Sequence, residues 1–196
     1  MEDISNMDRE ERILFFEENP ESDLVTLFPD DNIRFEWFEH HPEDERAATD
    51  KCEYIRWEWF RNHPEDERAV TDEDGYHVRA MWFRNHPEDE RAVTDKLSLI
   101  RKKWFENHLE DERAAVDINE EIRSQWFRNH PEDDRAVIDE DEDIRYQWFL
   151  NHPEDERAVI DEDEDIRWEW FRNHPDDKRS ITDKSESIRD RWGQTH

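Results

Sequence analysis

The sequence repeats itself every 22 residues over most of its length. Units that open with Ile-Arg, or with Val-Arg in one case, begin at residues 33, 55, 78, 100, 122, 144, 166 and 188, and the only interval of 23 follows Ile55. A short fixed period is typical of a solenoid, in which each unit packs only on its neighbours. The period therefore predicts one elongated array rather than one or two globular domains.

The composition alone would place the chain near the disordered class. Hydrophobic residues make up 33% of the 196 residues, charged residues make up 44%, and the formal net charge is -30. Two features favour folding instead: the charges recur at fixed positions of the repeat, and the apolar minority includes ten Trp and eleven Phe. Aromatic side chains bury a large area each, so we expect a folded chain.

We expect two helices in each unit. In the unit IRYQWFLNHPEDERAVIDEDED, His152 is the predicted N-cap of a helix of about eight residues, with Pro153 at its first position. Asp161 is the predicted N-cap of the next helix, and Glu164 three residues later completes a capping-box pattern. The second helix must end near Asn-His, because a residue that precedes proline is pushed out of the α region.

Helical spacing predicts the core and two rows of internal arginines. On a wheel of 100° per residue, Trp168, Glu169 and Arg172 fall opposite the buried arc. Arg145 lies inside that arc, and we expect it to pair with a carboxylate or a helix-end carbonyl of an adjacent unit; Arg157 belongs to a second row of ties. The predicted core residues of this unit are Ile144, Trp148, Phe149, Ala158 and Val159.

The two ends of the array depart from the repeat. Residues 1–32 have the character of a divergent N-terminal capping repeat, in which Phe15, Phe16 and Pro20 match Trp-Phe and Pro of the next unit. Residues 33–187 form seven tandem repeats, and residues 188–196 form a truncated C-terminal cap, in which Gly193 ends the last helix. Gly75 marks the one inserted residue, which we expect a local bend to absorb.

The run IRYQWFLNHP, and IR(x)2WF(x)NHP generally, resembles the pattern of the leucine-rich repeat variant family across about residues 12–192. The resemblance implies an all-α, right-handed solenoid that alternates an α-helix with a shorter or 3-10 helix. The second segment is shorter here and lacks that family's leucines, so a generic two-helix solenoid of the HEAT type stays the alternative.

Residue types that bind metals occur in the repeat, but their pattern favours a structural role. Adjacent repeats lie about 8 to 10 Å apart, too far for imidazoles of neighbouring units to share one ion easily. The acidic run DEDED lacks the spacing of a calcium loop and suits acidic helix starts instead. We expect no metal site and no cofactor. The histidines concerned are His41, His63, His86, His108, His130, His152 and His174.

Several functional classes are disfavoured. Cys52 is the only cysteine, which excludes an internal disulfide and fits a reducing, cytoplasmic compartment. No signal peptide or membrane-spanning stretch is visible, and the charge disfavours direct contact with nucleic acid. No nucleophile–base arrangement or phosphate loop occurs, so we expect a protein that is not an enzyme.

The surface then predicts binding of a basic macromolecule. Acid is concentrated in residues 1–32 and 122–165, and aromatic residues stand at the third repeat position, which the wheel places outward. One hypothesis is a DNA mimic that inhibits a DNA-binding protein or nuclease. The alternative is a protein-interaction scaffold that recognises its partner through exposed aromatics, with acidity serving solubility. The predicted partner-binding residues are Phe35, Trp57, Tyr146, Trp168, Glu140, Asp141, Glu142, Asp143, Glu162, Asp163, Glu164 and Asp165.

Overall fold

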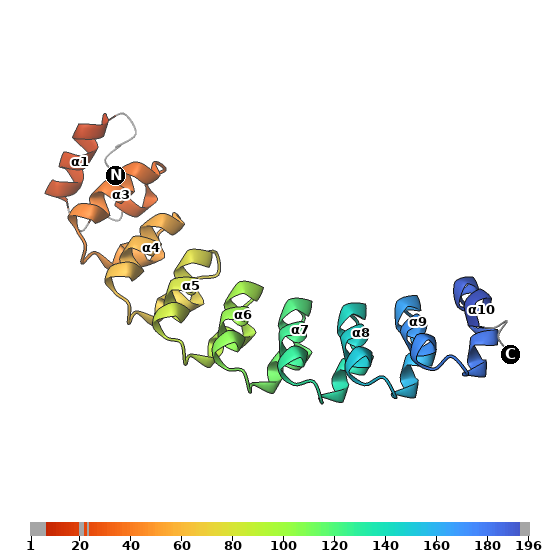
Figure 1. The fold of residues 1–196 in the computed structure, drawn as a ribbon. Helices are drawn as coiled ribbons and strands as arrows, with labels where there is room; N and C mark the ends of the chain where they lie inside the picture. Colours follow the sequence, from red (N-terminus) through yellow and green to blue (C-terminus); the bar gives the residue numbers. More distant parts are fainter. Residues whose placement is uncertain (1–6, 20–21, 23, 193–196) are drawn as a thin grey trace. The chain divides into compact units, whose positions relative to one another are not determined.

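The computed structural model describes residues 7–19, 22 and 24–192, and every regular element in these ranges is helical (Figure 1). The predicted all-α class is therefore confirmed for the described part of the chain. Pro20, the predicted proline of the N-terminal capping repeat, and Gly193, the predicted end of the last helix, lie outside the described residues. The chain divides into two compact units, Met1–Trp104 and Phe105–His196.

From residue 45 on, the first unit alternates short 3-10 helices with α-helices. Helix α1 packs on α3, and the ring of Phe16 meets that of Trp37 edge to face at 5.8 Å between centroids. In chain order the elements are α1 (Arg9–Glu18), α2 (Leu24–Leu27), α3 (Asp31–His40), η2 (Glu45–Thr49), α4 (Glu53–Asn62), η3 (Glu67–Thr71), α5 (Tyr76–Asn85) and η4 (Glu90–Thr94). Helix α6 (Ser98–Asn107) crosses the boundary between the units.

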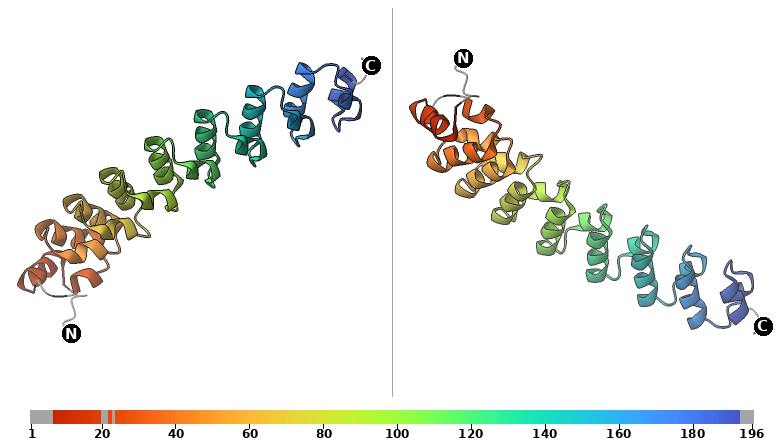
Figure 2. Two further views of the ribbon diagram at one scale, coloured as in Figure 1. Left: turned by 90° about the horizontal axis from the view of Figure 1, so that it is seen from below. Right: turned by 90° about the horizontal axis from the view of Figure 1, so that it is seen from above.

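The second unit repeats the same pairing without an inserted residue. Each 3-10 helix packs on the α-helix that follows it, so that successive helix pairs lie side by side (Figure 2). Its elements are η5 (Glu112–Val116), α7 (Glu120–Asn129), η6 (Asp134–Ile138), α8 (Glu142–Asn151), η7 (Glu156–Ile160), α9 (Glu164–Asn173), η8 (Lys178–Thr182) and α10 (Glu186–Trp192).

The helix predicted to start at His-Pro is wrong in its start and its length of about eight residues, while the short 3-10 form is one that the resemblance implied. His152 is the C-cap of α8, with φ -123° and ψ 66°, and Pro153 lies in the turn that follows. The short helix begins only after Asp155, whose carboxylate accepts a hydrogen bond from the Arg157 backbone N–H at 3.1 Å. Because His-Pro ends α8 and the turn uses two more residues, only five remain for a 3-10 helix before the next junction.

The second predicted helix is confirmed but begins two residues later than expected. Asp163, rather than Asp161, caps α9, and its carboxylate accepts hydrogen bonds from the backbone N–H groups of Asp165 and Ile166. Glu164 is then the first helical residue, so the predicted capping box is wrong. Asp161 is not available as a cap because Arg145 and the Asp163 N–H already bind its carboxylate.

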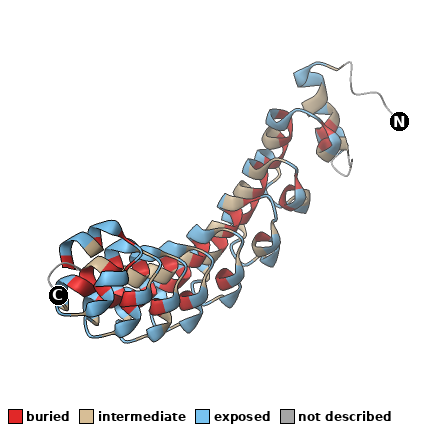
Figure 3. Cartoon of the chain, turned by 90° about the vertical axis from the view of Figure 1, so that its right-hand side faces the viewer, coloured by how far each residue is buried: buried red, intermediate tan, exposed pale blue. Residues whose placement is uncertain are grey.

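The core is the one that the helical spacing predicted. Ile144, Trp148, Phe149, Ala158 and Val159 are all buried, and buried positions recur on each helix along both units (Figure 3). The wheel is wrong about Glu169, which is buried in α9 beside Arg172. The aliphatic and Trp-Phe positions of the repeat therefore supply the apolar contact area, and alanine fills the space between the α-helix and the 3-10 helix.

Buried arginines join consecutive repeats. Arg145 donates through Nε to Asp161 of its own repeat at 3.0 Å, and through Nη1 to the backbone carbonyl of Asp139, which closes the preceding repeat, at 2.7 Å. The predicted carbonyl partner in the adjacent unit is confirmed, while the carboxylate comes from the same unit. The equivalent carboxylate pairs are Arg34–Asp50, Arg56–Asp72, Arg79–Asp95, Arg123–Asp139 and Arg167–Asp183.

The inserted residue lengthens one turn. The carboxylate of Asp72 accepts a hydrogen bond from the backbone N–H of Gly75, three residues further along the chain. In the ordinary repeat the equivalent carboxylate, Asp50, accepts a hydrogen bond from the backbone N–H of Cys52, only two residues further along. A Cβ at Gly75 would lie 2.5 Å from Oδ2 of Asp72, so the turn closes only because glycine has no side chain.

Candidate protein-interaction surface

Most carboxylates of the repeat have partners within the fold. In the DEDED segments, Asp139 and Asp161 bind the buried arginines, and Asp141 and Asp163 cap α8 and α9. Asp141 and Asp163 are half-buried, so two of the predicted partner-binding acids act as helix caps.

Six predicted acids remain exposed, and we refer to them as the surplus carboxylates. Five of them accept no hydrogen bond from another protein group. Glu164 differs because it accepts from the hydroxyls of Ser185 and Ser187, both at 2.7 Å, and these bonds lower its pKa. All six lie where one repeat joins the next. They are Glu140, Glu142, Asp143, Glu162, Glu164 and Asp165.

The predicted aromatic anchors are half-buried rather than fully exposed. In the first unit, Phe35 lies 5.0 Å from Tyr54, and Tyr54 stacks on Trp57 at 5.9 Å between ring centroids. In the second unit, Trp168 meets Trp192 edge to face at 4.5 Å. Phe35 and Trp168 therefore pack on the next helix of the array, whereas Trp57 packs on Tyr54 of its own helix. Tyr54, the exposed member, was not singled out from the sequence.

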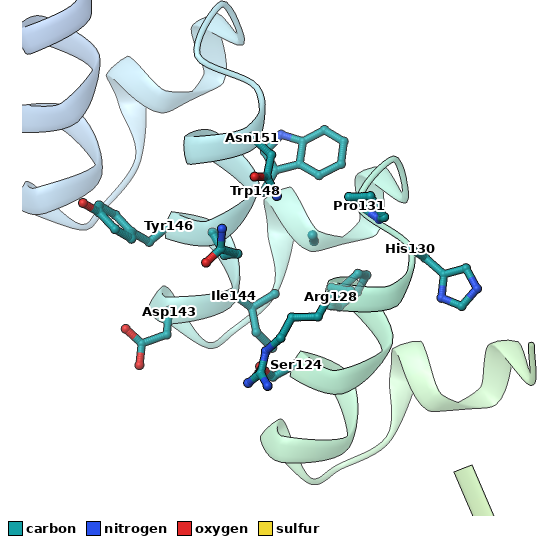
Figure 4. Close-up of a pocket in the computed structure, with 12 residues that line it drawn as sticks. Ser124, Arg128, His130, Pro131, Asp143, Ile144, Tyr146, Trp148 and Asn151 are labelled. Atoms are coloured by element: carbon teal, nitrogen blue, oxygen red, sulfur yellow. The ribbon is translucent and has the colours of Figure 1, made fainter. Parts of the chain in front are cut away.

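Tyr146 instead borders an open groove between α7 and α8. The groove has a volume of about 240 Å³, and a groove of the same size lies between α3 and α4. Figure 4 shows Ser124 and Arg128 on the α7 side and Tyr146 and Asn151 on the α8 side. Ser124 lines the α7 side of this groove, at the repeat position that Phe35 has in the groove between α3 and α4.

Repeat histidines stack on the Trp four residues before them, as at His41, His63, His86, His130, His152 and His174. His152 lies 3.8 Å from Trp148 between ring centroids, its Nδ1 donates to the Trp148 carbonyl at 3.0 Å, and its Nε2 lies 3.3 Å from Glu132 of the preceding repeat. The predicted packing on Trp is thus confirmed, while the predicted N-cap role is wrong. Among the described residues no group of three His, Cys, Asp or Glu side chains could hold a metal ion.

A Trp–Asp–Arg triad recurs in the repeats, and the sequence analysis missed it. Trp148 Nε1 donates to Asp155 at 3.0 Å, Arg157 binds the same carboxylate through Nε and Nη2, and its guanidinium lies 6.0 Å from the Trp148 ring centroid. The hydrogen bonds from arginine, and secondly those from tryptophan, lower the pKa of Asp66, Asp89, Asp133, Asp155 and Asp177 to about 2. Asp44 forms the same triad with Trp37 and Arg46, and its pKa is lowered too.

The second unit also exposes a row of aliphatic side chains that the sequence analysis did not single out. Val116, Ile138 and Ile160 end their 3-10 helices with 71%, 81% and 80% of their surface exposed, and Ile118 is 88% exposed. We call these four residues the aliphatic row. The sequence contained this signal, since the repeat position of Val116, Ile138 and Ile160 holds Thr at residues 49, 71, 94 and 182. Ile118 stands two residues further on, where the other repeats carry Lys or Glu.

No protein-family model, curated protein or solved structure matches this chain. Among the described helices, none combines the length and the apolar character that crossing a membrane requires.

Proposed function

We propose that this chain is a non-enzymatic repeat protein that needs no cofactor and binds a basic protein in the cytoplasm. Its 22-residue helix pairs form a right-handed solenoid of the kind that the leucine-rich repeat variant pattern implies. The surplus carboxylates support the binding proposal because they are exposed and, apart from Glu164, their side chains accept no hydrogen bond from another protein group. Glu142, Asp143, Glu164 and Asp165 also lie in the first turns of α8 and α9, where the helix dipole favours acids.

The electrostatics favour this class of partner. A net charge of -30 attracts a basic surface over several ångströms, and the attraction weakens as salt screens it. The sharper form of the proposal is a DNA mimic that inhibits a DNA-binding protein or nuclease, because carboxylates held at regular intervals can replace a row of phosphates. Such a partner would bind either DNA or this protein, but not both.

Competition tests the mimic. A candidate nuclease is titrated with this protein at several DNA and salt concentrations, and inhibition should weaken as either rises. Inhibition that is independent of both DNA and salt would contradict the mimic.

Matched charge variants test the position of the site. Both variants remove four carboxylates and so change the net charge equally, but only the first should lose binding strongly. The first variant carries Glu→Gln at residues 140, 142, 162 and 164, and the control carries Glu→Gln at residues 43, 45, 65 and 67. An equal loss from both would show that total charge, rather than the surplus carboxylates, carries the interaction.

The alternative proposal is a scaffold that recognises its partner through aromatic residues. Tyr146 favours it, because its ring borders an open groove. Replacing Trp57, Tyr146 and Trp168 by Ala should then abolish partner capture, whereas neutralising the surplus carboxylates should have little effect. A partner that is lost only from the carboxylate variant would exclude this alternative.

A further inference from the structure

The aliphatic row is unusual on so polar a chain. Single exposed apolar residues are common on proteins, but a contiguous apolar patch on a soluble chain indicates an interaction site. Here four large aliphatic side chains, from 71% to 88% exposed, occupy consecutive repeats of one unit. Threonine at the same position elsewhere, as at Thr49 and Thr182, bonds its own helix carbonyl, so the position does not require an apolar residue.

The members of the row lie side by side because neighbouring 3-10 helices are in register. Arg135 of η6 lies 3.9 Å from Glu112 of η5, the charge of Asp134 of η6 acts on Arg157 of η7, and Arg179 of η8 lies 3.2 Å from Glu156 of η7. Each interaction joins neighbouring 3-10 helices, so the last residues of successive 3-10 helices follow each other along the same face. Figure 2 shows the same succession of helix pairs within the second unit.

Carboxylates accompany the row. Two residues beyond Ile138 and Ile160 stand the exposed acids Glu140 and Glu162, both of which belong to the surplus carboxylates. The intervening aspartates turn inward to the buried arginines, as Asp161 does to Arg145. The surface therefore alternates a fully exposed aliphatic side chain with an exposed carboxylate, once in each of these two repeats.

We infer that the aliphatic row and its carboxylates form the docking site for a basic amphipathic helix of a protein partner. This inference rests on the proposed function and adds an apolar component to it. Neighbouring helical repeats lie about 8 to 10 Å apart, and two turns of an α-helix advance about 10.5 Å. A helix with an aliphatic residue at every seventh position therefore places one side chain on each of Val116, Ile138 and Ile160, which occupy successive repeats, with Lys or Arg facing the acids.

The charge argues against a second copy as the occupant. Both copies would bring the same acids to the interface, and like charges that face each other across an interface disfavour association. A basic amphipathic helix can cover the aliphatic row with its apolar face and pair its Lys or Arg side chains with the carboxylates.

A designed peptide tests the site on the full chain. The probe is a fluorescent 22-residue helical peptide with Leu at every seventh position and Lys beside it, and its control has the same composition in scrambled order. Ile138→Thr/Ile160→Thr installs the residue that other repeats use there, and it should weaken binding of the probe about tenfold or more. Leu109→Thr, at an aliphatic residue outside the row, should leave binding unchanged.

The outcomes separate this inference from the proposed function. If Glu140→Gln/Glu162→Gln loses binding while Ile138→Thr/Ile160→Thr does not, the aliphatic site is wrong and the acidic site stands. If the scrambled peptide binds as tightly as the probe, the aliphatic site is likewise wrong and the acidic site stands. If the unmodified protein binds neither peptide, both proposals fail. If sedimentation shows that the unmodified protein forms a dimer that the Ile→Thr variant cannot form, the occupant is a second copy and the inference is overturned.

Discussion

Replacing Asp161 by Ala should destabilise the second unit more than any change of an exposed carboxylate. Its carboxylate accepts three hydrogen bonds: from Arg145 Nε at 3.0 Å, from Arg145 Nη2 at 3.2 Å, and from the Asp163 N–H at 2.8 Å. The side chains of Arg145 and Asp161 are only 15% and 7% exposed. Removing the acid would leave a guanidinium largely out of water with two backbone carbonyls, those of Asp139 and Glu140, as hydrogen-bond partners.

The expected loss of unfolding free energy is about 3 to 5 kcal/mol, the range for breaking one side of a buried ion pair. Urea unfolding, followed by helical circular dichroism, measures it. Repeat proteins can unfold in parts, so hydrogen exchange of the α8 and α9 amides should accompany the denaturation curve. These amides should lose protection first.

Two further variants sharpen the test. Glu162→Ala, one residue along, removes an exposed carboxylate without a hydrogen bond and should change stability by about 0.5 kcal/mol or less. Arg145→Met combined with Asp161→Ala should recover part of the loss, because no uncompensated charge remains. Two results would contradict this account of how Arg145 joins the repeats. One is a loss of less than about 1 kcal/mol of unfolding free energy in Asp161→Ala. The other is a double variant that is no more stable than Asp161→Ala alone.

Three other changes have definite expected outcomes. Gly75→Ala should cost about 1 to 3 kcal/mol in urea unfolding, because the new Cβ displaces Asp72 from its arginine; no loss would show that the turn can relax. Trp148→Phe should cost about 2 kcal/mol, because the hydrogen bond to Asp155 and part of the buried ring are lost; an unchanged urea midpoint would contradict a stabilising triad. The triad aspartates other than Asp44 have a folded-state pKa of about 2 against an ordinary value of 3.8, so the stability they give is present above about pH 4 and is lost as the pH falls through about 2. After solvent screening this is roughly 1 kcal/mol per site. An acid titration of the helical signal measures it, and a chain equally stable at pH 2 and pH 5 would contradict it.

The sequence predicted the repeat and its core because both depend on spacing. Ile144 and Trp148 are four residues apart, and a helix places such residues on one face. The buried arginine row followed from the same spacing. The helix boundaries did not follow, because three acids within five residues, Asp161, Asp163 and Asp165, are equally good N-caps in isolation. The hydrogen bonds from Arg145 hold the carboxylate of Asp161, so that Asp163 becomes the N-cap of α9. This contact is tertiary and cannot be read from the spacing of the acids.

The candidate surface was harder to predict than the fold. The exposed acids could be named from composition, but which of them the fold uses depends on contacts 16 residues away along the chain, such as Arg123 to Asp139. The half-burial of Trp168 depends on Trp192 of the next repeat, which a single-helix wheel cannot represent. The aliphatic row could have been found by comparing the repeats position by position, since Val and Ile replace Thr only in consecutive units.

The arginine tie makes the number of repeats easy to change in evolution. Each unit opens with an arginine that needs only an aspartate in its own unit and a closing carbonyl in the unit before it. If residues 144–165 were deleted, Arg167 would meet the carbonyl of Asp139 in place of that of Asp161, which is chemically the same group. Unequal recombination between the segments that code for two repeats could therefore lengthen or shorten the protein by whole units. The extent of the binding face would change with it, while every junction kept its bonds.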